Sequence, residues 1–197
     1  MKLKTGATIF VMTAPITGEI WGDRIEEPTA YIAVQSQRPF TELRPALQAA
    51  RDALSAAIEG VTEAQAAFRP ASGEGEDAWG IAEVLRHIGT MDVIFAQRIR
   101  QLGKGEPVDV QATYPGFMEN VETRDIAELR DILHRSYETL LDAIGAIDGR
   151  ERLDATDTHR RFGPLNCRGW VVMHTLHIED HARQIGKIKA LTGYPAC

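Results

Sequence analysis

Four long segments of this 197-residue chain carry apolar side chains at alternating steps of three and four residues. This spacing places those side chains along one face of an α-helix. The segments cover residues 41–60, 80–103, 125–149 and 166–191. A helix with one apolar face must bury it against another element, and four such helices are typical of a four-helix bundle. We therefore predict an all-α four-helix bundle.

The first forty residues do not follow this pattern. Two short apolar runs, 7–14 and 31–34, contain β-branched residues and are surrounded by proline and glycine. Such a composition favours an extended or β-hairpin arrangement over a helix. We expect an N-terminal extension over residues 1–40, irregular or hairpin-like, which is either an arm or partly disordered. Residues 41–197 are expected to form one bundle domain.

The composition excludes several classes of protein. A formal net charge of −6 provides no broad basic face for nucleic acid. No apolar run approaches the roughly 20 residues of a membrane-spanning helix. The two cysteines, Cys167 and Cys197, are too few for a disulfide scaffold or a cysteine-based zinc site. We expect a cytoplasmic protein that acts on a small molecule, without nucleic acid or a membrane as partner.

Three of the six histidines lie in one stretch of eight residues inside the last helical segment. His174, His177 and His181 are spaced so that they share one face of that helix. Burying an imidazole costs free energy unless it finds a partner, and one divalent metal ion would serve several imidazoles at once. His87 is the only histidine within the apolar face of another predicted helix. It is therefore the best candidate for a ligand from outside the cluster.

The spacing leaves two ligand pairs open. His177 and His181 are one helical turn apart, and His174 and His177 are three residues apart, so either pair can converge on one ion. His174 and His181 are two turns apart, roughly 10 Å along the axis, and can hardly share an ion. One of the three is therefore expected outside the ligand set, where it supports a ligand or bonds elsewhere in the core.

Two further side chains have competing interpretations. Glu83 lies one turn before His87 and is expected either to orient that imidazole or to bond the N-terminus of its own helix. Cys167 begins the last helical segment, where the helix dipole favours a thiolate, but no base is evident beside it. The remaining aromatic and imidazole side chains are expected to be core anchors (Trp79, Trp170) and surface or loop residues (His134, His159).

Four pieces of the sequence match the pattern of a known family. The matching pieces are Phe68-Arg-Pro70, Trp79-Gly-Ile-Ala-Glu-Val-Leu-Arg-His87-Ile, Trp170 and His177-Ile-Glu-Asp-His181-Ala-Arg-Gln184-Ile. Through them, residues 41–191 resemble the DinB-like superfamily of bacterial four-helix metalloproteins, also called YfiT-like. The resemblance implies that His87, His177 and His181 bind the metal ion and that His174 lies outside the ligand set. Gly80 departs from the family pattern, which often has a serine at that helix cap.

The resemblance also implies a function. It points to a divalent metal ion, zinc first, with nickel, iron or manganese as alternatives. It implies a metal-dependent hydrolase or a thiol-dependent transferase, in which the ion activates water or a low-molecular-weight thiol. It further implies a homodimer formed through helix faces. The alternative is a non-catalytic, stress-related binding module whose metal is structural or absent, which a closed fourth coordination position would favour.

Overall fold

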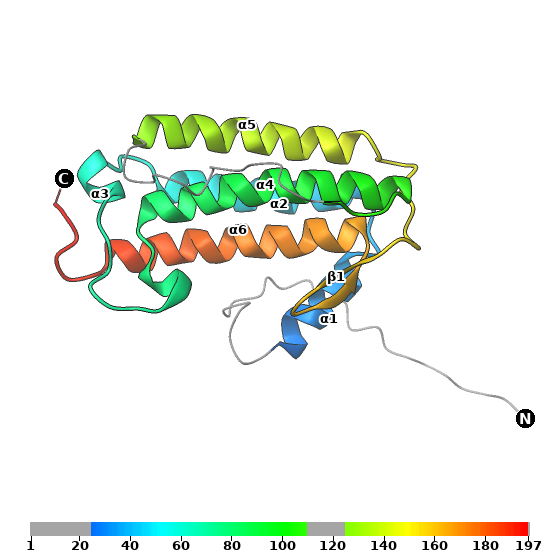
Figure 1. The fold of residues 1–197 in the computed structure, drawn as a ribbon, viewed down its shortest axis with the longest axis horizontal. Coiled ribbons are helices and arrows are strands. Elements are labelled where there is room, and N and C mark those ends of the chain that lie inside the picture. Colours follow the sequence, from blue (N-terminus) through cyan, green and yellow to red (C-terminus); the bar gives the residue numbers. More distant parts are fainter. Residues whose placement is uncertain (1–24, 110–124, 197) are drawn as a thin grey trace, which may run out of the picture.

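The computed structural model describes residues 25–109 and 125–196. The four long helices predicted from the apolar spacing are α2, α4, α5 and α6, so the all-α bundle is confirmed (Figure 1). In chain order the elements are α1 (Glu26–Gln35), α2 (Phe40–Ala57), α3 (Glu63–Ala66), the 3-10 helix η1 (Gly75–Ala78), α4 (Ile81–Lys104), α5 (Ile126–Gly145), β1 (Asp157–His159), β2 (Gly163–Leu165) and α6 (Cys167–Lys189).

Helix α4 packs against both α5 and α6, while α2 packs against α6. Helices α4 and α5 run in the same direction, because Gly103 near the end of α4 lies against Ile147, just past the end of α5. A Cβ atom on Gly103 would overlap the Ile147 side chain, so this close approach requires glycine. The Arg152 N–H also donates to the Gly103 carbonyl at 2.8 Å. Helix α6 runs antiparallel to α4, which brings its later turns beside the early turns of α4 (Figure 1).

Helices α5 and α6 each begin at a side chain that accepts from an N–H group of the first turn. Asp125 accepts from the Glu128 N–H at 2.6 Å, and Asn166 accepts from the Gly169 N–H at 2.9 Å. Such caps stabilise a helix by about 1 kcal/mol each. They fix the start of α5 and of α6.

The predicted apolar faces meet in one core. Its largest fully buried side chains come from all four long helices and from α1, and each contributes about 1.5–3 kcal/mol relative to an exposed position. They are Trp170, Phe40, Ile32, Leu47, Leu54, Ile81, Leu85, Ile88, Ile99, Leu102 and Leu129.

The expectation of an extended or hairpin arrangement is wrong for residues 26–35, which form helix α1. Pro28 is tolerated because it lies in the first turn, where its missing N–H leaves no bond unmade. Ile32 is buried and α1 packs against α6, so burial outweighs the β preference of the 31–34 run. The first apolar run, 7–14, lies outside the described residues, as does most of the predicted extension.

A short hairpin between α5 and α6 precedes the last helix. Strands β1 and β2 pair antiparallel, with Asp157 opposite Leu165 and His159 opposite Gly163. Strand β2 packs against α6, and Figure 1 shows the hairpin at the start of that helix. Across the described residues, every helix is too short or too polar to cross a lipid bilayer.

Candidate metal centre

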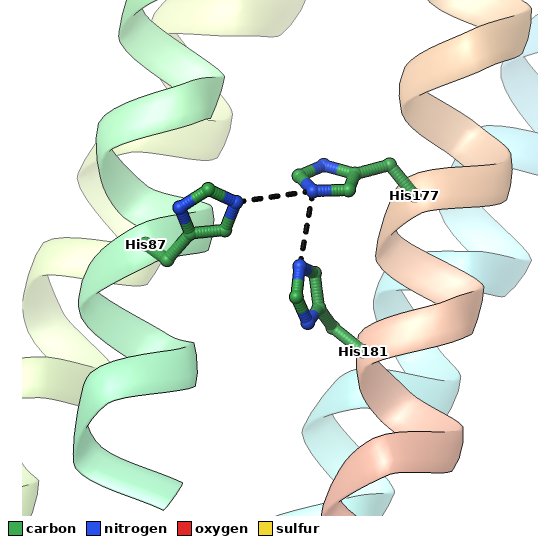
Figure 2. Close-up of side chains that lie close together, drawn as sticks. All are labelled: His87, His177 and His181. Atoms are coloured by element: carbon green, nitrogen blue, oxygen red, sulfur yellow. Dashed lines mark hydrogen bonds between the residues drawn. The ribbon is translucent and has the colours of Figure 1, made fainter. Parts of the chain in front are cut away.

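Two antiparallel helices bring three imidazoles together. His177 and His181 lie one turn apart on α6, and His87 faces them from the second turn of α4 (Figure 2). The His87 Nε2 atom is 3.1 Å from the His177 Nε2 atom, which is 3.0 Å from the His181 Nε2 atom. One donor atom from each residue lies within 4.8 Å of the other two. His177 and His181 are 5% and 1% exposed, so the cluster belongs to the core.

The spacing of these nitrogens fits a metal ion. Zinc held at about 2.0–2.1 Å in a tetrahedral site places its ligand nitrogens about 3.3 Å apart. Pairs at 3.0 and 3.1 Å need only a small expansion to reach that value. The three imidazoles of this cluster are therefore compatible with a divalent ion between α4 and α6.

The hydrogen bonds of His181 assign its tautomer. Its Nδ1 atom lies 2.6 Å from the Gln184 Oε1 atom, which can only accept, so Nδ1 carries the proton. Gln184 is held in turn by its Nε2 atom, which donates to the Glu76 carbonyl at 2.6 Å. The Nε2 lone pair of His181 is therefore directed at the cluster, as a metal ligand requires.

His174 is outside the cluster but supports His177. Its Nε2 atom lies 2.7 Å from the Asp92 Oδ1 atom, and its Nδ1 atom lies 3.5 Å from the His177 Nδ1 atom. A carboxylate accepts, so His174 donates through Nε2 and its Nδ1 is free to accept from His177. This arrangement leaves the His177 Nε2 lone pair facing His87 and His181.

Asp92 is the centre of a polar network that joins all four bundle helices. It is completely buried and contacts Arg51 of α2 at 3.1 Å, Ser136 of α5 at 2.7 Å and His174 of α6. Arg51 also donates to the Leu133 carbonyl. A carboxylate that accepts three hydrogen bonds and faces a guanidinium is compensated for its loss of hydration. The network therefore fixes where His174, and through it His177, can lie.

Burial keeps the three clustered imidazoles neutral. It lowers the pKa of His87 to about 3, with a further lowering from the positive charges that His181 and His174 carry when protonated. Burial likewise lowers the pKa of His177 well below its ordinary value, again helped by its histidine neighbours. The pKa of His181 is lowered by burial, against the opposing effect of Gln184. Neutral imidazole is the form that binds a metal ion, so the site is prepared for one at neutral pH.

The structure decides the roles of two residues near the cluster. Trp79 is not a simple core anchor, because its half-buried ring lies 4.9 Å from the His87 ring and stacks 6.2 Å from the His181 ring. Glu83 takes the second of its two expected roles. Its carboxylate accepts from the Gly80 N–H at 2.8 Å and pairs with Arg69 at 2.6 Å.

A thiolate at Cys167, which the helix dipole would favour, is not supported. The side chain is completely buried, and burial, with the negative charge of Glu151, raises its pKa to about 11. Desolvation outweighs the favourable field of the helix N-terminus. His134 is exposed on α5, as expected.

A cleft of about 740 Å³ opens beside the cluster and reaches His87 and His177. His159, expected to be a surface or loop residue, lies half-buried in this cleft. Its position depends on the packing of the β1–β2 hairpin against Trp170, and no local sequence pattern marks it. The cleft is lined by Ile25, Glu76, His87, Met91, Phe95, His159, Arg160, Arg161, Met173 and His177.

The residues of the Asp92 network were also missed, although the sequence held a signal for them. Asp92 lies four residues after Ile88 and three before Phe95, so the helical spacing places a carboxylate on an apolar face. Arg51 and Ser136 interrupt the faces of their own helices in the same way. A charged residue at a core position on each of two helices indicates a buried ion pair.

Comparison with known proteins gives one match. A sequence model described as the DinB superfamily matches residues 46–185. This range contains the three clustered histidines, His174 and Asp92. No curated protein and no solved structure matches this chain.

Proposed function

Because the chain belongs to the DinB superfamily, we propose that His87, His177 and His181 bind one divalent metal ion and that the protein is a metal-dependent enzyme. The observation that carries this proposal is the convergence of three neutral imidazoles, those of buried His177 and His181 and of half-buried His87, beside an open cleft. Three such imidazoles with one position left open are the ligand set of a catalytic zinc site.

Zinc is the metal we propose first. Three imidazole nitrogens suit zinc, and they also bind nickel and iron, whereas manganese prefers more oxygen ligands. When bound, such an ion acts as a Lewis acid and lowers the pKa of a water or a thiol in its open position. His174 and Gln184 hold the tautomers of two ligands, which supports binding through Nε2.

The cleft favours an enzyme over a module with a structural metal. A structural zinc site is closed by four protein ligands, whereas here an approach of about 740 Å³ reaches His87 and His177. Volumes of roughly 300–1,000 Å³ are usual for sites that bind small molecules. We propose that a small-molecule substrate enters there.

The nucleophile is proposed to come from solution. Among the described residues that line the cleft, none is a serine, threonine, cysteine or lysine. Water or a low-molecular-weight thiol is therefore the reactant we propose, which gives a hydrolase or a thiol S-transferase. Glu76 and His159 line the same cleft and are the titratable groups available to exchange a proton with it.

Metal content tests the site. Purified protein would be incubated with zinc, nickel, iron(II) or manganese, desalted, and analysed by elemental mass spectrometry. We expect about one zinc ion per chain in the wild type and in His134→Ala, whose histidine is exposed on α5. We expect loss of the ion in His87→Ala, His177→Ala and His181→Ala. Near-stoichiometric zinc in those three variants would refute the ligand assignment.

Activity tests the reaction class. Zinc-loaded protein would be assayed for release of nitrophenol from nitrophenyl esters by water, and for displacement of halide from an electrophilic aryl halide by a small thiol, which forms a thioether. We expect one of the two reactions to require zinc and to be lost in His177→Ala. Stoichiometric zinc with no reaction in either assay, across several substrates, would favour the non-catalytic module. The homodimer and the cytoplasmic location stay predictions, and light scattering after gel filtration tests the former.

A further inference from the structure

The cleft beside the three histidines extends along α6. At one end the His159 ring packs 5.4 Å from the Trp170 ring, and at the other Gln184 donates to the Glu76 carbonyl. Both His159 and Glu76 line the cleft. Trp170 and His181 lie next to these two ends and are roughly 16 Å apart along the helix, and between them Met173 and His177 of α6 line the cleft. A small organic molecule can therefore lie along the helix with one end beside His87 and His177.

The two ends of the cleft carry opposite charge. Arg160 and Arg161, in the turn between β1 and β2, line the hairpin end. Glu76 lines the other end. The wall between them is apolar and includes Met91 and Phe95 of α4 and Met173 of α6. A pair of guanidinium groups is notable in a chain whose net charge is −6, because the overall field of the protein favours cations.

The turn that carries the two arginines is held in place by His159. The His159 Nδ1 atom accepts from the Arg161 N–H at 3.1 Å and from the Phe162 N–H at 3.2 Å. The His159 ring also stacks on the Phe162 ring at 4.8 Å. A turn fixed by its backbone presents its side chains from constant positions, which reduces the entropy lost on binding.

The electrostatic surroundings of His159 support this arrangement. Burial is the main cause that lowers its pKa to about 4, and the charges of Arg98, Arg160 and Arg161 lower the pKa further. His159 is therefore neutral at pH 7, and its Nδ1 atom stays an acceptor for the turn. The positive charges near this end of the cleft come from the arginines.

We propose that the cleft binds a small organic oxyanion, with its carboxylate or phosphate at Arg160 and Arg161 and its apolar body against Met91, Phe95 and Met173. Guanidinium groups match the geometry of both oxyanions. Glu76 repels an anion from the far end and so sets the orientation of the molecule. The far end of the molecule then lies beside His87 and His177, and its reaction there rests on the proposed function.

Calorimetric titration of the metal-free and the zinc-loaded protein tests this proposal. The probes are 3-phenylpropionate and phenyl phosphate, with 3-phenylpropanamide as the neutral analogue and acetate as the anion without an apolar body. We expect both aromatic anions to bind the metal-free protein at least about tenfold more tightly than the amide, because each charged hydrogen bond is worth roughly 1.5–3 kcal/mol. The tighter of the two identifies the oxyanion.

The matched variants separate the arginines from general charge. We expect Arg160→Gln/Arg161→Gln to weaken binding of the better anion at least about tenfold, while Arg160→Lys/Arg161→Lys retains part of the affinity. The control, Arg135→Gln/Arg150→Gln, removes the same charge from exposed positions in α5 and just after its end, and should bind as the wild type does. Circular dichroism would show that all three variants fold.

Two outcomes would overturn the proposal. One is equal affinity of the metal-free Arg160→Gln/Arg161→Gln variant and its control for the better anion. The other is binding of the amide as tight as that of the carboxylate. Because the metal-free titration does not depend on the ion, loss of the metal assignment would leave its result interpretable. Conversely, a failed anion site would leave the zinc stoichiometry unchanged.

Discussion

The His174 Nε2 atom lies 2.7 Å from the Asp92 Oδ1 atom, and both side chains are completely buried. This pair connects the polar centre of the bundle to the three-histidine cluster, because the other ring nitrogen of His174 faces His177. A carboxylate behind a metal-ligating histidine is a common means of fixing its orientation. Here a second imidazole lies between the carboxylate and the candidate ligand.

Replacing Asp92 by alanine is expected to affect both stability and metal binding. Arg51, Ser136 and His174 would lose a common acceptor in the core, which costs about 3–5 kcal/mol of unfolding free energy for a broken buried pair. Because His177 would lose its support, we also expect zinc affinity to fall about 10–100-fold. Urea denaturation and competition with a zinc chelator measure the two effects.

Asp131→Ala is the control for this prediction, because Asp131 pairs with Arg135 on the exposed side of α5. Its stability should change by less than about 0.5 kcal/mol, with zinc affinity intact. If Asp92→Ala kept wild-type zinc affinity, the network would be structural only.

Gln184 is expected to support His181 in the same manner. Gln184→Ala removes the acceptor of the His181 Nδ1–H, so we expect zinc affinity to fall about 10–100-fold. Lys187→Ala, at an exposed position of the same helix, should leave the affinity unchanged. Chelator competition on both variants tests this, and equal affinities would show that His181 needs no fixed tautomer.

The glycine at the start of α4 gives a prediction of stability. Serine is the better helix cap, but a Cβ atom on Gly80 would overlap the Phe68 carbonyl oxygen. We therefore expect Gly80→Ser to lower the free energy of unfolding by about 1–3 kcal/mol. Gly186 lies inside α6 with open space around it, so Gly186→Ala should instead raise stability by about 0.5–1 kcal/mol. A more stable Gly80→Ser protein in urea denaturation would contradict the close approach.

The metal-free protein is expected to lose stability in mild acid. His159 has a pKa of about 4 in the folded protein against 6.5 for an ordinary histidine. Burial lowers the pKa of His87 to about 3. The unfolded chain therefore binds more protons below pH 6.5, so unfolding free energy falls as the pH drops from about 6.5 towards 4. Each such histidine adds a slope of at most about 1.4 kcal/mol per pH unit.

Urea denaturation at several pH values measures this slope. His159→Asn removes one contributor and should flatten the dependence between pH 6.5 and 4. An equal slope in wild type and His159→Asn would show that His159 is not held neutral in the folded protein.

The bundle follows from the sequence because apolar spacing is a local property of each helix. The interior pairing of His87 with the α6 histidines was also predicted, since a polar ring on an apolar face is evident in the sequence alone. The common direction of α4 and α5 was not predicted, because it is seen only in the contact of Gly103 with Ile147. The half-buried position of His159 and the formation of helix α1 likewise depend on packing between residues that are distant in sequence.

The choice between the two histidine pairs shows the limit most clearly. Spacing permitted His174 with His177 as well as His177 with His181, and the family resemblance chose the latter pair. In the structure the Asp92 carboxylate accepts a hydrogen bond from the His174 Nε2 atom, which keeps this nitrogen out of the three-histidine cluster. That partner lies 82 residues away in sequence, so no local pattern identifies it.

Anomalous diffraction at the zinc absorption edge, from crystals of the zinc-loaded protein, tests the central claim most directly. We predict one strong peak between α4 and α6, about 2.0–2.1 Å from the Nε2 atoms of His87, His177 and His181. His174 should stay bonded to Asp92 and outside the coordination sphere. A peak on His174, or zinc found only at other positions, would contradict the account.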